Sequence, residues 1–130
     1  MSTIFSKIVT GEISSYKVAE DERFLAFLDI FPLANGHVLV IPKKKTDYIF
    51  EIDSKEYLLF WQFAKQVAKA MNKVVDCERI GVAVIGLEVP HAHIHLVPIN
   101  GVDDINFEKQ KLKFSEQEFE DIARKIREEV

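Results

Sequence analysis

The stretch His91-Ala92-His93-Ile94-His95 holds three of the four histidines in a chain of 130 residues. Alternate residues of a β-strand project from one face, so a strand here would place the three imidazoles side by side. Ala92, Ile94 and Leu96 would then project from the opposite face. Burying three titratable rings together costs stability, so the pattern indicates a chemical function rather than a structural one.

Three interpretations of these histidines remain open at this level. A lone histidine is most often structural, but three in one run plus His37 on another expected strand disfavour that interpretation. A zinc site with an open position is the second. On a strand, however, His91 and His95 lie about 13 Å apart, too far to join His93 easily in one tetrahedron. No carboxylate or cysteine lies at an obvious ligand spacing. In the third, one imidazole attacks phosphorus while its neighbours orient it and bind the phosphate.

Composition indicates one globular domain over 1–130, with 48% hydrophobic and 29% charged residues. A net charge of −4 argues against a nucleic-acid-binding face, which needs an excess of Lys and Arg. The single Cys77 fits a reducing compartment. We see neither a signal peptide nor an apolar run of the roughly 20 residues that span a bilayer. We therefore expect a cytoplasmic protein without nucleic-acid or membrane partners.

The alternation of apolar and polar residues predicts an α+β fold with an antiparallel sheet of about five strands. The short link before the last strand favours antiparallel pairing of the final two strands. A turn over 31–36 contains Asn-Gly, which accepts positive φ. The expected strands are 16–20, 24–29, 37–42, 80–85 and 92–98, and the expected helices are 5–10, 54–75 and about 115–129.

Two of the predicted helices carry clear end signals. We expect Ser54 to cap the long helix, with Glu56 in its first turn, and Ser115 and Glu118 to form a capping box on the last one. The long helix carries two apolar stripes, although one suffices to pack on a sheet. The second stripe predicts that another part of the chain or a second subunit covers a further face.

The run from His91 to Val97 resembles the signature of the histidine triad (HIT) family, in which three histidines alternate with apolar residues. Segments 4–9, 11–13, 27–32 and 36–44 also resemble family blocks, in the family's order. The resemblance covers about residues 3–99 and is strongest to the Hint-like nucleotide-binding branch. It implies a HIT-like fold, with a helical extension over about 115–129.

The resemblance implies a role for each histidine. His93 would be the nucleophile that attacks an α-phosphorus, giving a nucleotidyl-histidine that water hydrolyses to a nucleoside monophosphate. His95 would contact the phosphate and leaving group, His91 would orient the nucleophile, and His37 would join the hydrogen-bonded network beneath them. The covalent step requires no metal and no cofactor.

The resemblance also implies how the nucleotide is held. Asp29 would accept hydrogen bonds from the ribose hydroxyls, which suits an acceptor-only carboxylate. Apolar residues would surround the base, with plain core packing as the alternative for each of them. These residues are Phe5, Ile8, Phe27 and Ile30.

The loop before the triad departs from the family. Many members have Gly-Gln-Ser or Gly-Gln-Thr there, whose polar groups meet the phosphate, whereas this chain keeps Gly86 but has Glu88 at the hydroxyl position. We hypothesise that Glu88 selects a cationic or amine leaving group. The family's asparagine on the preceding strand is also absent, and Lys45 stands where many members carry a histidine.

The expected function is hydrolysis of a purine nucleoside phosphoramidate or a related adenylated compound, with an AMP-like nucleotide as the ligand. One alternative is a dinucleoside polyphosphate hydrolase. Another is a nucleotide-binding regulatory protein with vestigial catalysis. The family further implies a homodimer whose two sheets run on into one, which agrees with the double apolar face of the long helix.

Overall fold

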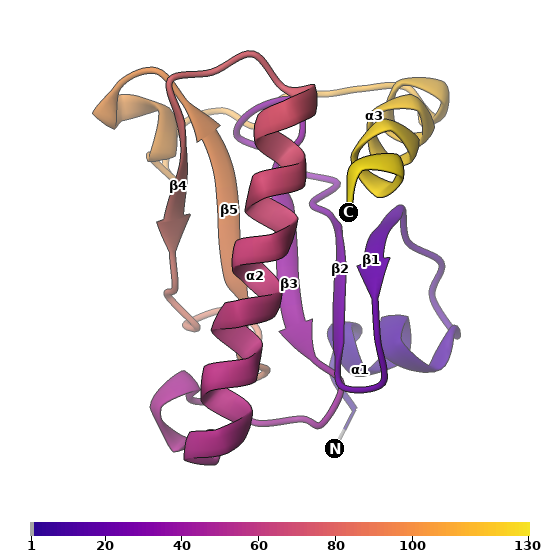
Figure 1. Cartoon of the computed structure of the whole chain (residues 1–130), viewed down its shortest axis with the longest axis vertical. Coiled ribbons are helices and arrows are strands. Elements are labelled where there is room, and N and C mark those ends of the chain that lie inside the picture. Colours follow the sequence, from indigo (N-terminus) through magenta and orange to yellow (C-terminus); the bar gives the residue numbers. More distant parts are fainter. Residues whose placement is uncertain (1) are drawn as a thin grey trace.

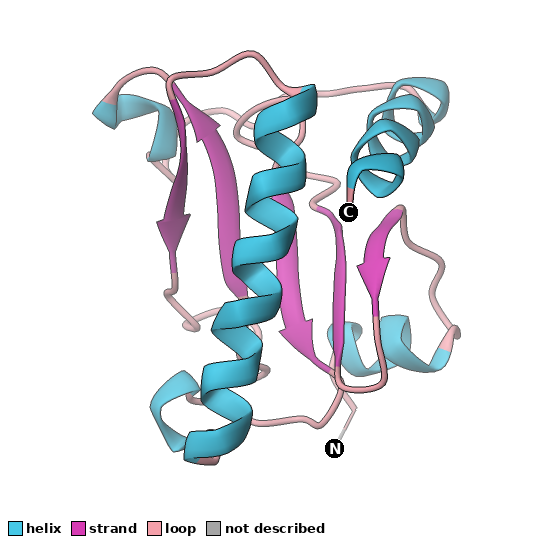
Figure 2. Ribbon diagram, viewed as in Figure 1, coloured by secondary structure: helices cyan, strands magenta, loops and turns pink. Residues whose placement is uncertain are grey.

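The computed structural model describes residues 2–130, which form a five-stranded sheet with helices on both faces (Figures 1 and 2). The strand order is β1-β2-β3-β5-β4, and each neighbouring pair is antiparallel. The predicted α+β class is confirmed. The strands are β1 (Lys17–Glu20), β2 (Phe24–Leu28), β3 (Val38–Pro42), β4 (Arg79–Ala83) and β5 (Ile94–Ile99).

The helices lie on opposite sides of this sheet. In Figure 1 the long α2 crosses in front of the strands, whereas the short α1 lies behind them. No helix among the described residues has the length and apolar character needed to cross a membrane. The helices are α1 (Ile4–Thr10), α2 (Ser54–Val74) and α3 (Glu116–Glu129), with 3-10 turns η1 (Ile49–Glu51) and η2 (Val102–Ile105).

The sheet separates two hydrophobic clusters, because alternate residues of the central strands face opposite sides. Along β2, Phe24, Ala26 and Leu28 pack on the α2 side, while Leu25 and Phe27 pack on the α1 side. Both clusters are buried, so β2 and β3 are covered on both faces. The α1-side cluster consists of Phe5, Ile8, Leu25, Phe27, Leu39 and Ile41.

The histidine run enters the sheet later than predicted. Ala92 donates its N–H to the Thr46 carbonyl at 2.6 Å, so this part of the chain lies outside the ladder, and β5 begins only at Ile94. The predicted side-chain alternation nevertheless holds, because Ala92, Ile94 and Leu96 are buried in the α2-side cluster. The last two residues of the predicted strand 80–85 likewise lie beyond β4.

The prediction that Ser54 caps α2 is wrong. Asp53 is the N-cap, because its carbonyl accepts from the Tyr57 N–H at 2.8 Å and the first turn therefore closes one residue earlier. The predicted capping box on α3 is confirmed. Ser115 Oγ accepts from the Glu118 N–H at 3.1 Å, and Glu118 Oε1 accepts from the Ser115 N–H at 2.8 Å.

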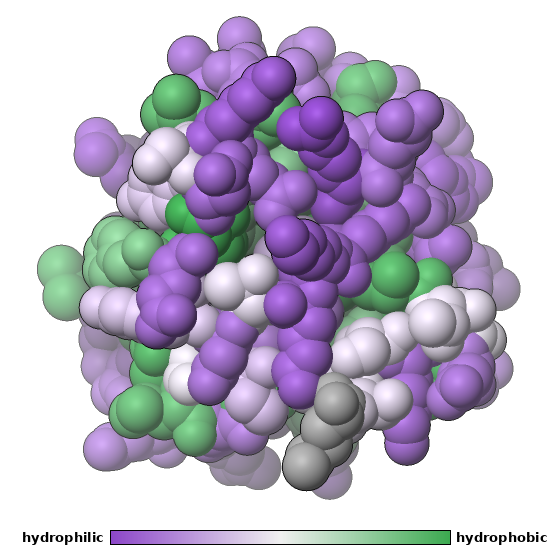
Figure 3. Space-filling view, turned by 90° about the horizontal axis from the view of Figure 1, so that it is seen from below, coloured by the Kyte–Doolittle hydropathy of each residue, from purple (hydrophilic) through white to green (hydrophobic). Residues whose placement is uncertain are grey.

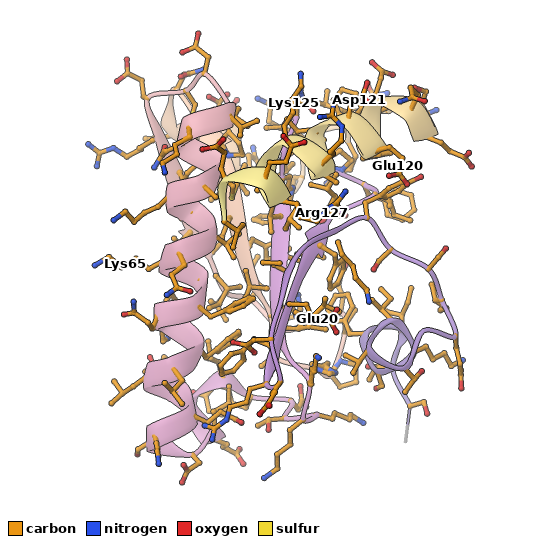
Figure 4. All side chains as sticks on the ribbon, turned by 45° about the vertical axis from the view of Figure 1, so that its right-hand side comes forward. Glu20, Lys65, Glu120, Asp121, Lys125 and Arg127 are labelled. Carbon is orange, nitrogen blue, oxygen red and sulfur yellow. The ribbon has the colours of Figure 1, made fainter. Side chains whose placement is uncertain are left out.

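Helix α3 covers part of the broad apolar surface of α2. Its buried residues join the α2-side cluster, and Phe119 stacks on Tyr16 with ring centroids 5.0 Å apart. Arg127, labelled in Figure 4, donates to the Lys17 carbonyl and ties α3 to β1. Leu58 stays 70% exposed, so α3 leaves part of the apolar surface of α2 uncovered.

Candidate active site

All four histidines are buried, with exposures between 0% and 8%. His95 lies on β5, His91 and His93 lie in the segment that enters it, and His37 immediately precedes β3. The rings of His93 and His95 are 5.0 Å apart, and those of His37 and His95 are 5.2 Å apart. The structure therefore brings together the four histidines that the sequence singled out.

The protonation of His93 follows from its backbone contact. Its Nδ1 lies 2.7 Å from the carbonyl oxygen of His91, and a carbonyl can only accept, so Nδ1 carries the proton. The lone pair is then on Nε2. Burial lowers the pKa of His93, while the Glu88 carboxylate raises it. The ring is neutral at pH 7 and holds one unprotonated nitrogen.

His37 and His95 form a hydrogen-bond relay that begins at a backbone amide. The Leu33 N–H donates to His37 Nδ1 at 3.0 Å, which places the His37 proton on Nε2. His37 Nε2 donates in turn to His95 Nδ1 at 3.0 Å, so the His95 proton is on Nε2. Burial lowers the pKa of His37 to about 3 and that of His95 to about 4. His95 therefore offers a neutral N–H donor.

His91 anchors the first helix to the sheet. Its Nε2 donates to the Pro42 carbonyl at 2.7 Å, so its Nδ1 accepts from the Thr3 hydroxyl at 3.4 Å. Thr3 Oγ1 also accepts from the Ser6 N–H at 3.0 Å and caps α1. Sequence reasoning missed Thr3, although threonine is a favoured N-cap residue and Thr3 lies just before the expected first helix.

Asp29 lies next to the relay, with its side chain 18% exposed. One carboxylate oxygen accepts from the Phe31 N–H at 2.8 Å, and the other lies 3.6 Å from His37 Nε2. Because His37 is neutral, the latter contact is polar rather than an ion pair. Burial raises the pKa of Asp29, and the charge of Lys111 opposes that shift.

One set of described residues has the composition of a metal site. Ligand atoms of Asp29, His37 and His95 all lie within 4.8 Å of one another. However, His37 Nε2 carries a proton, and its contact with His95 Nδ1 occupies the His95 lone pair. A metal ion would have to break both hydrogen bonds of the relay, so these donors fit a proton-holding network better than a ligand set.

The comparisons with known proteins decide the family. Residues 10–101 match the HIT domain. This chain belongs to the HIT family. An uncharacterized HIT-like protein from Borreliella burgdorferi is 34% identical over 131 residues, covering 95% of this chain and 94% of the relative. The adenosine 5′-monophosphoramidase of Schizosaccharomyces pombe is 38% identical over 103 residues, covering 75% and 74%. A Hit-like protein from Bartonella henselae superposes with a TM-score of 0.86 at 30% identity, covering 99% and 96%.

The apolar residues expected near the base of a nucleotide lie on the α1 side of this HIT protein. Phe5, Ile8 and Phe27 are buried in the α1-side cluster, and the Phe5 ring lies 5.0 Å from that of His93. Ile30 differs from them because it is 52% exposed and follows Asp29. Three of the four are thus core residues, and of these Phe5 contacts a triad histidine.

The loop of this HIT protein before the triad is polar at one position only. Gly86 has a φ of 75°, a left-handed conformation that favours glycine, and Glu88 is exposed within electrostatic reach of His93. A cavity of about 380 Å³ lies between η1, α2 and the loop, and Gly86 and His93 are among the residues that line it. Its apolar lining includes Tyr48, Phe50, Tyr57, Trp61, Ile85 and Leu87.

Two residues beside the relay lie beyond the HIT-domain match. The ring centroid of Phe107 is 4.6 Å from that of His95. The charge of Lys111 lowers the pKa of Asp29 and that of His37. Sequence reasoning treated this part of the chain as a polar connection. No local pattern there signals a contact with residues some 70 positions earlier in the chain.

Proposed function

We propose that this HIT protein is a nucleotide hydrolase that acts at the α-phosphorus of a purine nucleoside 5′-phosphoramidate. The observation that carries the proposal is the His91 carbonyl bound to Nδ1 of His93, because it leaves Nε2 as a neutral buried nucleophile. The name of the Schizosaccharomyces pombe relative, adenosine 5′-monophosphoramidase, supports the same choice of substrate.

In the proposed first step, His93 Nε2 attacks the α-phosphorus and the phosphorus–nitrogen bond to the leaving amine breaks. The electron pair of that bond stays with the amine, which takes up a proton from solvent. The His95 Nε2–H points its proton at a phosphate oxygen and stabilises the negative charge that develops there. Through its carbonyl, His91 keeps the His93 proton on Nδ1.

In the second step, water attacks the same phosphorus and the bond to His93 Nε2 breaks. The products are a nucleoside monophosphate and the free imidazole, with the water proton released to solvent. The substrate is held by Asp29 at the ribose hydroxyls and by the apolar wall at the base. We assign that wall to Phe5, Ile8, Phe27 and Ile30, with Gly86 leaving room for the phosphate.

Glu88 favours an amine over a phosphate as the leaving group. Its carboxylate is near enough to His93 to raise the pKa of that residue. A leaving group bound beside His93 therefore feels the same negative charge, which repels an anionic phosphate and attracts a protonated amine. This distinguishes the proposed phosphoramidase from a dinucleoside polyphosphate hydrolase, whose leaving group is an anionic phosphate. We expect Glu88→Gln to reduce turnover of the phosphoramidate and to leave or raise that of the polyphosphate. Equal effects on both substrates would contradict the assignment.

Trapping the intermediate tests the function directly. The protein is mixed with an adenosine phosphoramidate, quenched within a turnover and analysed by intact mass and peptide mapping. We expect an adenylyl group on His93, and no adduct on a His93→Ala protein that still binds AMP. Turnover of only dinucleoside polyphosphate would favour the alternative hydrolase. AMP binding without turnover of either substrate would favour a regulatory binding protein.

We also propose a homodimer formed through β4 and the neighbouring apolar surface. Within residues 2–130, no strand pairs with the outer edge of β4, and Val82 on it is 50% exposed. Exposed apolar side chains continue from β4 onto η1 and α2. Figure 3, which views the molecule from below, shows hydrophobic patches on its left-hand side, the side of β4 in Figure 1. The most exposed of these side chains are Tyr48, Phe50, Leu58, Ile85 and Leu87.

A further inference from the structure

The connection between β5 and α3, residues 102–114, folds back over the histidine relay. We call this segment the strap, and it follows the HIT-domain match, which ends at residue 101. In Figure 1 it leads from η2 across the upper end of the sheet to α3. Leu112 donates its N–H to the Pro32 carbonyl at 2.9 Å, which ties the strap to the turn that also provides the Leu33 amide.

Phe107 is the strap residue that touches the relay. Its ring centroid lies 4.6 Å from that of His95 and 6.3 Å from that of His37, with interplanar angles of 67° and 74°. These are edge-to-face contacts, which fix the relative orientation of the rings. The phenyl ring is half-buried, so it lies between the two buried imidazoles and solvent.

Lys111 holds this part of the strap in place. Its Nζ donates to the carbonyl of Phe107 at 2.5 Å and to that of Lys109 at 3.0 Å, closing the strap on itself. The ammonium charge also lowers the pKa of Asp29 and that of His37. One side chain therefore fixes the backbone that carries Phe107 and places a positive charge beside the relay, which disfavours a second positive charge there.

We propose that Phe107 is a positioning residue that shields His95 from water and keeps it in one tautomer. In this proposal, Lys111 holds Phe107 against His95. This inference rests on the proposed function for its catalytic meaning, because His95 is the donor to the phosphate. Water at His95 would compete for its Nδ1 and favour a charged ring. The titratable and charged groups facing His95 are His37, His93, Asp29 beyond His37, and Lys111 on the strap.

Nitrogen-15 NMR of the histidine rings tests the inference without any need for turnover. In the wild type we expect His95 to carry its proton on Nε2 and to stay neutral down to low pH. In Phe107→Ala the midpoint of His95 titration is expected to rise toward that of a free histidine by about one pH unit or more. Phe114→Ala is the matched control, because Phe114 is on the same strap but packs on Phe119 instead.

Two outcomes would overturn the inference. One is an unchanged His95 titration in Phe107→Ala, and the other is an equal shift in Phe114→Ala, which would show only a general loosening. Lys111→Met should shift His95 in the same direction as Phe107→Ala, whereas Lys113→Met, on the exposed part of the strap, should not. If Lys111→Met leaves His95 unchanged, Lys111 does not hold Phe107.

An activity measurement adds the catalytic readout. With an adenosine phosphoramidate, Phe107→Ala should lower kcat about tenfold and change KM little, because the donor to the phosphate is affected rather than the base or ribose contacts. A KM effect without a kcat effect would contradict positioning of His95. If the wild type turns over no nucleotide, the proposed function fails, while the NMR experiment still decides the role of Phe107.

Discussion

His37 Nε2 lies 3.0 Å from His95 Nδ1, and a single backbone amide decides the direction of this hydrogen bond. Because the Leu33 N–H occupies His37 Nδ1, the proton of His37 must point at His95. His95 is then left with its own proton on Nε2. The turn before β3 thus sets the protonation of a residue 62 positions later than Leu33 in the chain.

The first prediction concerns this relay. His37→Leu removes the donor to His95 Nδ1 and leaves that nitrogen unpaired in a buried site, so we expect kcat with an adenosine phosphoramidate to fall about 10- to 100-fold. His37→Gln retains an N–H donor and should recover part of the loss. Steady-state kinetics with both variants checks this, and a His37→Leu protein with unchanged kcat would show that the relay does not act on catalysis.

The second prediction is a loss of stability in acid. Burial holds the pKa of His37 at about 3 and that of His95 at about 4, below the value of about 6.5 in an unfolded chain. At a pH between the folded and the unfolded pKa of each histidine, that histidine is protonated in the unfolded chain but neutral in the folded one. The free energy of unfolding therefore falls as pH drops below about 6.5, by up to about 1.4 kcal/mol per pH unit for each histidine. Above that pH both states are neutral at these residues and the contribution is constant.

Urea unfolding at pH values from about 4.5 to 7 measures this slope. His37→Gln removes one of the buried titrating groups, so its stability should depend on pH with a slope smaller by about one proton. The difference between the two slopes isolates His37 from carboxylates that titrate in both proteins. Parallel slopes would mean that His37 is already protonated or solvated in the folded protein.

Much of the fold follows from local sequence signals. The five strands, their antiparallel order at β4 and β5, and the capping box at Ser115 were predictable because each depends on residues close together in the chain. Gly36 has a φ of 88°, as the Asn-Gly turn predicts. The cap of α2 was mispredicted, because Ser54 and Asp53 are equally good cap residues and only the backbone decides between them.

The residues of the site were predictable from the sequence, but the contacts among them were predictable only in part. Alternation placed the three histidines on one face even though β5 begins at Ile94. The Thr3 and Phe107 contacts were not predictable in the same way, because they join residues 88 and 12 positions apart through packing of whole elements. The direction of the relay also requires the Leu33 amide, a backbone group that no side-chain pattern reveals.

The third prediction concerns the tie between α1 and the triad. Thr3→Val keeps the shape of the side chain but removes both the cap on Ser6 and the donor to His91, so the free energy of unfolding should fall by about 1 to 2 kcal/mol. Thr10→Val is the matched control, because Thr10 lies at the exposed end of the same helix and bonds only to the Lys7 carbonyl. Chemical denaturation of both variants gives the comparison. Equal losses would show that neither the cap on Ser6 nor the contact with His91 contributes beyond what a Thr→Val change costs at Thr10.

The fourth prediction tests the proposed homodimer at β4. A charge at Val82 would lie on the outer strand beside the apolar surface of η1 and α2, where a second copy would bury it at a cost of several kcal/mol. We expect the wild type to sediment as a dimer and Val82→Glu as a monomer. Val102→Glu is the matched control, because Val102 is 91% exposed but lies on η2.

The same pair of variants separates assembly from folding. Circular dichroism spectra that match the wild type would show that Val82→Glu acts on association, since its side chain is half-exposed in one copy of the chain. A dimer that survives Val82→Glu but dissociates in Val102→Glu would move the interface to the other end of β5, next to η2. A monomeric wild type would leave the edge of β4 open and remove the explanation offered for its exposed aromatic neighbours Tyr48 and Phe50.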